Sequence, residues 1–167
     1  MNDPLYTRAR EHALYLLERR DYSKAELLHK LTRPPRNQKK QPIDENTAKK
    51  VLENLSELGL IDDARFAAKL ARHLLFDMKY GIYKAATQMR YKGIPSGIVE
   101  NALEEYSKET ENYSPVDKIK GLVKTKYARR LKEENGYKKV VSALYNRGFS
   151  YDDIKIALQE IEDEQEI

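Results

Sequence analysis

The chain has 167 residues, with 35% charged side chains, seven glycines and a formal net charge of +4. It has no cysteine, which excludes disulfides and thiol chemistry and makes the cytoplasm the simplest expected location. No stretch approaches the roughly 20 apolar residues of a membrane-spanning helix. The mixed charges of residues 1–20 indicate a helix rather than a signal peptide. Sparse glycine and proline with abundant charge favour an all-α fold.

Three helices are predicted at the beginning of the chain. The first covers Pro4–Arg19, and the second opens at Ser23, whose hydroxyl can form a capping box with Glu26. Asp44 caps the third helix, whose apolar residues form a single stripe. Gly59 ends this helix, because glycine readily adopts the left-handed conformation of a helix stop.

Residues 32–44 separate the second and third of these helices. They contain three prolines and four basic residues. Because proline blocks helix continuation, the segment is predicted to be a loop and the most mobile part of the chain.

A second group of three helices is predicted further on. Asp62 and Asp63 stand at the start of its first helix, where acidic side chains suit the helix dipole. Gly93 ends the second helix and Pro95 opens the third. The residues expected to line the first two helices are Phe66, Leu70, Leu74 and Met78, followed by Ile82, Ala85, Ala86 and Met89.

A third group begins at Ser114 and Pro115, a cap followed by a first-turn proline. Gly148 stops its second helix, and Ser150 with Asp153 caps its last one. The buried residues expected in its first and last helices are Ile119, Leu122, Val123 and Tyr127, followed by Ile154, Ala157, Leu158 and Ile161.

The three groups are related in sequence. Gly81–Tyr106 aligns without a gap with Gly136–Ile161, at an offset of 55 residues. A weaker copy lies upstream, where Leu28 corresponds to Met89 at an offset of 61. Small helical repeats bury little surface alone and are stabilised by stacking. The pattern therefore predicts an elongated array of three tandem three-helix repeats, with boundaries at 1–60, 61–112 and 113–167.

Charge is unevenly distributed. Residues 30–50 carry a local net charge of +5 and residues 114–147 one of +7, whereas residues 148–167 carry −6. Two basic zones and an acidic tail suit a polyanionic or acidic partner. Solvated helix faces account for the same pattern equally well.

Catalytic chemistry is not predicted. His12, His29 and His73 have no metal-binding spacing, and the acidic pairs Asp62–Asp63 and Asp152–Asp153 adjoin predicted helix starts, where they serve as caps. No nucleophile–histidine–carboxylate set and no phosphate-binding loop can be defended. We therefore expect a protein that is not an enzyme, with no catalytic residue, cofactor or metal.

A contact surface is the remaining kind of site. Basic residues alternate with tyrosines, a combination that can hold phosphates and bases or a protein partner. The tyrosines can equally well cover the boundaries between repeats. The candidate contact residues are Lys79, Arg90, Lys92, Arg129, Arg130, Lys132, Lys138, Lys139 and Arg147, with the last six as the best cluster.

Short motifs in a fixed order resemble the RecX family. They are Ile61–Ala67, Lys79–Gly81 and Lys92–Ile94 in the middle of the chain, Tyr145–Phe149 near its end and Arg20–Ser23 near its start. The resemblance covers about residues 5–162. The motif positions expected to serve mainly structure are Asp63, Arg65, Phe66, Gly81, Gly93 and Gly148.

The resemblance implies a regulator of DNA repair, recombination and the SOS response. Members of this family bind the RecA filament in its helical groove, generally suppress its assembly or activity, and perform no chemistry; a monomer is expected. The chain departs from the family at residues 74–78 and 82–84, where arginines are common. The contact surface is therefore expected to rely on the third repeat. Two alternatives stay open, a non-specific DNA-binding module and a helical scaffold for another protein.

Overall fold

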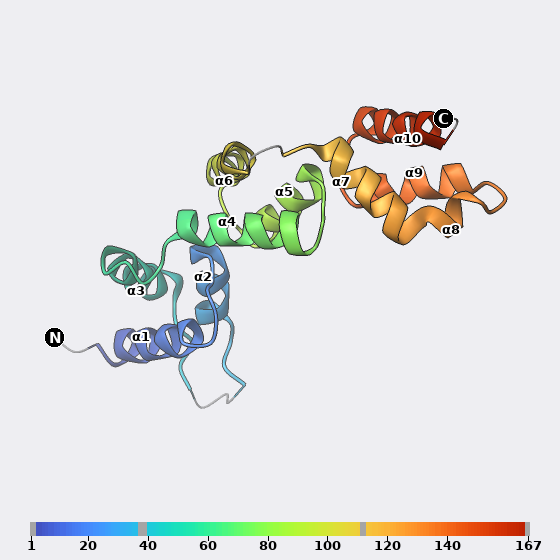
Figure 1. Ribbon diagram of the computed structural model, residues 1–167. Coiled ribbons are helices and arrows are strands. Elements are labelled where there is room, and N and C mark those ends of the chain that lie inside the picture. The colour runs from blue at the N-terminus through green and yellow to red at the C-terminus, as the bar shows by residue number, and fades with distance from the viewer. Residues whose placement is uncertain (1–2, 37–39, 111–112, 166–167) are drawn as a thin grey trace. The chain divides into compact units, whose positions relative to one another are not determined.

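The computed structural model describes residues 3–36, 40–110 and 113–165. Every regular element in these ranges is a helix, which confirms the predicted all-α class (Figure 1). In chain order the elements are α1 (Pro4–Leu17), α2 (Lys24–Thr32), α3 (Glu45–Glu57), α4 (Asp63–Arg72), the π-helical turn η1 (His73–Asp77), α5 (Ile82–Tyr91), α6 (Ser96–Glu109), α7 (Pro115–Leu122), the π-helical turn η2 (Val123–Tyr127), α8 (Ala128–Leu131), α9 (Gly136–Asn146) and α10 (Tyr151–Gln165). None of the helices in the described ranges is long and apolar enough to span a bilayer.

The chain forms two compact units. Unit 1 comprises Met1–Lys69 and Met89–Val99, and unit 2 comprises Leu70–Gln88 and Glu100–Ile167. Helices α4, α5 and α6 contribute residues to both units. The predicted repeat boundaries divide the chain differently and stay a prediction.

Unit 1 contains α1, α2 and α3, which pack against one another (Figure 1). Each helix turns its apolar stripe inward, as the sequence pattern predicts. Its buried core consists of Ala9, Ala13, Tyr22, Leu27, Leu31, Ile43, Ala48, Val51, Leu52, Leu55 and Ile61.

Local capping explains where the helices of unit 1 begin and end. The predicted capping box of Ser23 and Glu26 is present, and the Asp44 side chain accepts from the Thr47 N–H at 2.9 Å. Gly59 has a φ of +70°, the left-handed stop that was predicted. The described residues between α2 and α3 are not helical, in line with the loop predicted at 32–44; residues 37–39 lie outside the described residues.

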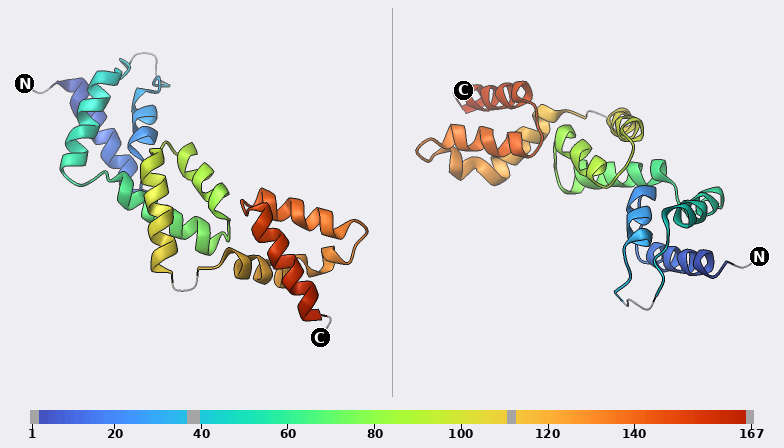
Figure 2. Two further views of the ribbon diagram at one scale, coloured as in Figure 1. Left: turned by 90° about the horizontal axis from the view of Figure 1, so that it is seen from above. Right: turned by 180° about the vertical axis from the view of Figure 1, so that it is seen from behind.

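Unit 2 contains α7 to α10, in which α10 packs on α7 and α9 (Figure 2). Ser114 caps α7 and Ser150 caps α10, both as predicted. The eight residues expected to be buried in the first and last helices of this region all lie in its core. The core consists of Ile119, Leu122, Val123, Tyr127, Val140, Leu144, Phe149, Ile154, Ala157, Leu158 and Ile161.

Two predicted packing positions were wrong, those of Met78 and Leu28. The face of α4 is buried through Ala67 and Ala71, and Phe66, like Leu70, is half-buried there. Met78 is 41% exposed, because the π-helical turn η1 widens the helix and rotates the following residues away from the expected face. In α2, the residue buried like Met89 is Leu31 rather than Leu28.

Candidate interaction surface

The first junction lies within unit 1 and joins the start of α2 to the turn after α5. We define it as Ser23–Ala25 against Lys92–Gly93. The fully buried Ser23 hydroxyl donates to the Lys92 carbonyl and accepts from the Glu26 N–H at 3.0 Å. The Glu26 carboxylate in turn accepts from the Ser23 N–H at 3.2 Å and pairs with the Lys92 ammonium at 3.5 Å. Side chains therefore supply most of this junction's polar contacts.

Glu26 is held in its ionised form. Burial alone would raise the pKa of its carboxyl, but hydrogen bonds from the Arg20 guanidinium and the Ser23 N–H, with the charge of Lys92, lower that pKa below its ordinary value. The Arg20 contact measures 3.2 Å. The first junction thus contains an ionised carboxylate, Glu26, that is surrounded by hydrogen-bond donors.

The second junction lies within unit 2 and joins the start of α5 to the turn after α9. We define it as Gly81–Lys84 against Arg147–Gly148. The Gly81 N–H donates to the Arg147 carbonyl at 2.8 Å, and the Tyr83 N–H donates to the Gly148 carbonyl at 3.2 Å. Main-chain groups therefore meet directly here.

Side chains reinforce the second junction from its rim. The Arg147 guanidinium donates to the Met78 carbonyl at 2.6 Å and to the Lys79 carbonyl at 3.4 Å. It also lies 5.4 Å from the centre of the Tyr80 ring. Lys84 donates to the Asn146 carbonyl at 3.3 Å. These contacts fix the turn before α5 against the end of α9.

Glycine is required at both junctions. Gly93 and Gly148 have φ values of +75° and +90°, which other residues adopt at a cost. A Cβ at Gly93 would lie 2.5 Å from the Ala25 Cβ, and one at Gly148 would lie 2.3 Å from the Lys84 backbone nitrogen. A Cβ at Gly81 would lie 2.1 Å from the Gly148 carbonyl oxygen. These three motif glycines thus stand where two helices make close backbone contact.

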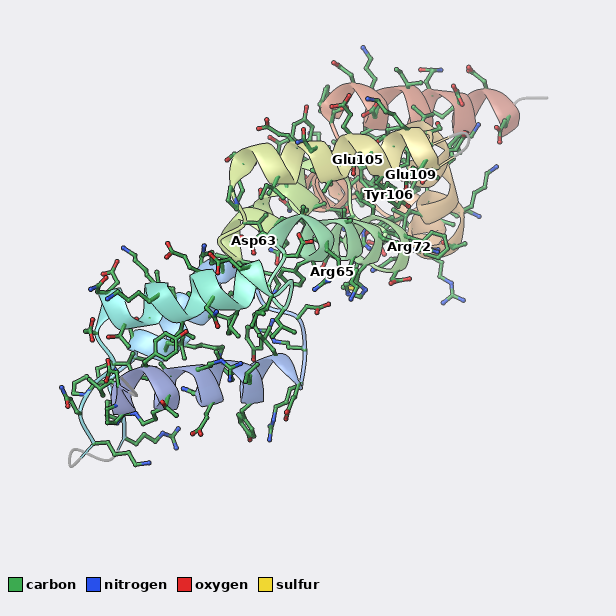
Figure 3. All side chains as sticks on the ribbon, turned by 90° about the vertical axis from the view of Figure 1, so that its left-hand side faces the viewer. Asp63, Arg65, Arg72, Glu105, Tyr106 and Glu109 are labelled. Atoms are coloured by element: carbon green, nitrogen blue, oxygen red, sulfur yellow. The ribbon has the colours of Figure 1, made fainter. Side chains whose placement is uncertain are left out.

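The other motif residues lie around α4. The Asp63 carboxylate accepts from the Lys24 N–H at 2.9 Å, and the Arg65 guanidinium donates to the Gly59 carbonyl at 3.3 Å. Figure 3 shows Asp63 and Arg65 near the start of α4 and Arg72 near its end. Phe66 is half-buried on the same helix. Asp63 and Arg65 therefore connect α4 to the helices before it.

The predicted basic candidates separate into two kinds. Helix α8 exposes Arg129 and Arg130, and Lys132 is exposed directly after its end. Lys138 is exposed on α9, which packs against α8. Lys139 is exposed too and pairs with Glu133 at 3.2 Å. The structure thus brings most of the best predicted cluster onto one helical hairpin.

The remaining candidates do not join that hairpin surface. Arg147 and Lys92 are partly buried in the second and first junctions. Lys79 is exposed in the turn before α5, with a φ of +52°, and Arg90 is exposed near the end of α5. Arg147 and Lys92 are therefore already engaged in contacts within the protein.

The acidic end of α10 neutralises other lysines of the basic zone. Lys120 pairs with Glu160 at 2.9 Å and with Glu164 at 2.6 Å, and Lys124 pairs with Glu164 at 2.9 Å. Hydrogen bonds from the two lysines lower the pKa of Glu164 to about 2. The positive charge of unit 2 is consequently strongest on α8 and α9.

A basic cavity of about 430 Å³ in unit 1 adjoins the loop that follows α2. Four cationic side chains line it, together with Glu11 and His12. The cationic residues are Arg8, Lys30, Arg33 and Lys40. The described part of the proline-containing loop therefore adds positive charge to this unit.

Sequence reasoning missed a groove of about 600 Å³ in unit 2, beside the second junction. Its walls include Tyr83 from α5, Tyr145 from α9 and Tyr151 from α10, which are 66%, 62% and 61% exposed. Only Tyr145 was singled out in the sequence. Tyr83 stands two residues after Gly81, and Tyr151 stands three residues after Gly148. Their closeness in sequence to these motif glycines is the signal that could have identified them.

A smaller cavity of about 230 Å³ shares Tyr83, Gly148, Phe149 and Ser150 with this groove and is also lined by Tyr113. The Tyr113 hydroxyl is buried and has no hydrogen-bond partner among the described residues. Burial, with the nearby Tyr106 and Asp153, raises its pKa to about 12.

The surroundings of Tyr113 are tightly packed. Tyr106, which Figure 3 shows on α6 between Glu105 and Glu109, meets the Tyr113 ring edge-on at a centroid distance of 5.8 Å. The Lys118 ammonium lies 4.8 Å from the Tyr113 ring centre and donates to the Leu75 carbonyl in η1 at 2.8 Å. Burial and the charge of Lys79 lower the pKa of Lys118.

Among the described residues, no group of three or more histidine, aspartate or glutamate side chains is arranged to hold a metal ion. The features that remain are surfaces: a basic hairpin, a basic cavity and a tyrosine-lined groove. Such an arrangement can bind a partner through charge and aromatic contacts.

Known proteins provide the identification. A regulatory protein RecX from Prosthecochloris aestuarii is 31% identical over 161 residues, covering 96% of this chain and 98% of the relative. A regulatory protein RecX from Clostridioides difficile is 28% identical, covering 96% of this chain and 71% of the relative. No protein-family model matches the chain.

Solved structures agree with these relatives. The crystal structure of RecX from Lactobacillus salivarius superposes with a TM-score of 0.77 at 25% identity, covering 95% of this chain and 97% of that one. A second RecX crystal structure, at 22% identity, has the same fold, with a TM-score of 0.71. The chain belongs to the RecX family of regulatory proteins.

Proposed function

We propose that this protein binds the RecA recombinase filament and inhibits its ATPase, strand exchange and growth. The observation that carries the proposal is the family membership, because the relatives that match nearly the whole chain are named regulatory proteins. In this proposal the protein is not an enzyme, works in the cytoplasm as a monomer and regulates recombination and repair.

The basic hairpin of α8 and α9 is the proposed contact surface. Arg129, Arg130 and Lys138 are exposed there, while Lys120 and Lys124 are neutralised by α10. Exposed cations mainly steer association and set its salt dependence. Several such contacts along a filament add, because each holds the next at high effective concentration.

ATP hydrolysis tests this proposal. Increasing amounts of the protein are added to RecA on single-stranded DNA, and the hydrolysis rate is followed. We expect the rate to fall at micromolar protein, and neutralising the hairpin with Arg129→Gln, Arg130→Gln and Lys138→Gln to weaken inhibition about 10-fold.

The matched control neutralises three exposed basic residues outside the hairpin, with Lys50→Gln, Arg72→Gln and Lys155→Gln. It removes the same charge and should inhibit like the wild type. An unchanged hydrolysis rate with wild-type protein contradicts the function, whereas equal inhibition by both triple variants contradicts only the contact surface.

The second candidate function is direct, sequence-indifferent binding of a nucleic-acid backbone. The basic cavity of unit 1 supports it, since Arg8, Lys30, Arg33 and Lys40 surround a space in which Glu11 is the one carboxylate among the described lining residues. Binding of this kind weakens steeply with salt. Measuring the affinity for DNA without RecA at two salt concentrations separates this function from the first.

A further inference from the structure

We propose that the tyrosine groove of unit 2 docks an uncharged segment of the partner protein through an apolar side chain. The groove is the space lined by Tyr83, Tyr145 and Tyr151 beside the second junction. The inference rests on the proposed function, since the filament is the partner it uses. Large exposed aromatic rings at one concave place are the usual anchors of protein interfaces.

The first junction shows that these rings are not needed to hold such a contact together. Ala25 lies against Gly93 as Lys84 lies against Gly148, so by these contacts, rather than by the 61-residue offset of the sequence repeat, Lys24 corresponds to Tyr83. At the 55-residue offset, Arg90 and Ser96 correspond to Tyr145 and Tyr151. The first junction closes with charged or small residues at all three positions. The three tyrosines are therefore not required for the packing of the second junction.

Because the groove has almost no unpaired charge, it favours a protein segment over a polynucleotide. Among the described residues its lining contains one charged group, Lys84, which already contacts the Asn146 carbonyl and lies 4.6 Å from the Tyr80 ring centre. The other polar walls are neutral, from Thr87, Gln88 and Asn146. Polyanions are attracted by unpaired cations, which lie on the α8–α9 hairpin instead. A neutral aromatic groove suits an apolar anchor.

Binding to RecA filaments assembled on single-stranded DNA tests the docking. The variant Tyr83→Ala, Tyr145→Ala, Tyr151→Ala should bind about 30-fold more weakly than the wild type. The control Phe76→Ala, Tyr91→Ala removes exposed rings outside both the groove lining and the α8–α9 hairpin and should bind normally.

Four results would overturn the inference. The groove variant binds filaments as tightly as the wild type, or the control variant loses as much affinity as the groove variant. Alternatively, the groove variant loses affinity for a single-stranded oligonucleotide without RecA to the same extent, or the wild-type protein does not bind filaments. The last alone also removes the proposed function. If the groove variant fails to fold, hydrogen exchange on the wild type decides: filaments should protect residues 83–88 and 145–151, and unchanged exchange there contradicts docking.

Discussion

The two junctions each join the start of one helix to the turn after another, but they do so through different contacts. In unit 1, the Ser23 hydroxyl and the Glu26 carboxylate bridge the start of a helix to the turn at Gly93. In unit 2, backbone groups of Gly81 and Gly148 meet without an intervening side chain. The difference teaches that both junctions need a glycine without a Cβ, but that the first depends in addition on ionisation and side-chain hydrogen bonds, whereas the second joins its two helices through main-chain hydrogen bonds. Within the described part of the chain, exposed tyrosines line a groove beside the second junction only.

The largest effect should come from adding a Cβ to the second junction. Gly148→Ala places a methyl group 2.3 Å from the Lys84 nitrogen at a φ of +90°. We expect the free energy of unfolding to fall by about 3 kcal/mol, measured by urea denaturation followed by circular dichroism. Gly121→Ala is the control, because a Cβ there meets nothing within 4 Å and should stabilise α7 by about 0.5–1 kcal/mol. Equal stabilities of the two variants would contradict the proposed role of the second junction.

Removing one hydroxyl should weaken the first junction by less. Ser23→Ala deletes a cap and leaves the Lys92 carbonyl without its donor, so the free energy of unfolding should drop by about 2 kcal/mol. Ser142→Ala, at an exposed position of α9, should change it little. If both serines can be replaced without loss, side chains do not hold the first junction.

The smallest effect concerns pH. The pKa of Glu26 is lowered in the folded protein, so its ionised form stabilises the fold above the ordinary value of 4.5. This contribution is lost as the pH falls through 4.5 and below. Glu26→Gln should therefore lose less stability than the wild type between pH 6 and pH 3, measured by thermal unfolding. The same loss in both proteins would show that Glu26 contributes nothing to acid sensitivity.

Local interactions made much of this fold predictable. The capping box at Ser23, the helix stops at Gly59 and Gly148 and the buried stripe of α10 depend on neighbours within a few residues. The exposure of Met78 was not predictable from periodicity, because the π-helical turn before it changes the helical register. Helix periodicity assumes a constant number of residues per turn.

The candidate site was predictable only in part. Arg129 and Arg130 were found by composition and are exposed. Arg147 looked like a contact residue, but its partners at Met78 and Lys79 lie nearly 70 residues away. The tyrosine groove combines α5, α9 and α10, and such a combination depends on tertiary packing that spacing along the chain does not encode.

Co-sedimentation with RecA filaments tests the central claim most directly. The protein is mixed at micromolar concentration with RecA on single-stranded DNA and ATP, and the filaments are pelleted. A regulator of the filament should appear in the pellet in a saturable amount and stay in the supernatant when RecA is omitted. Protein that remains in the supernatant with filaments present, or that pellets equally with DNA alone, would contradict the claim.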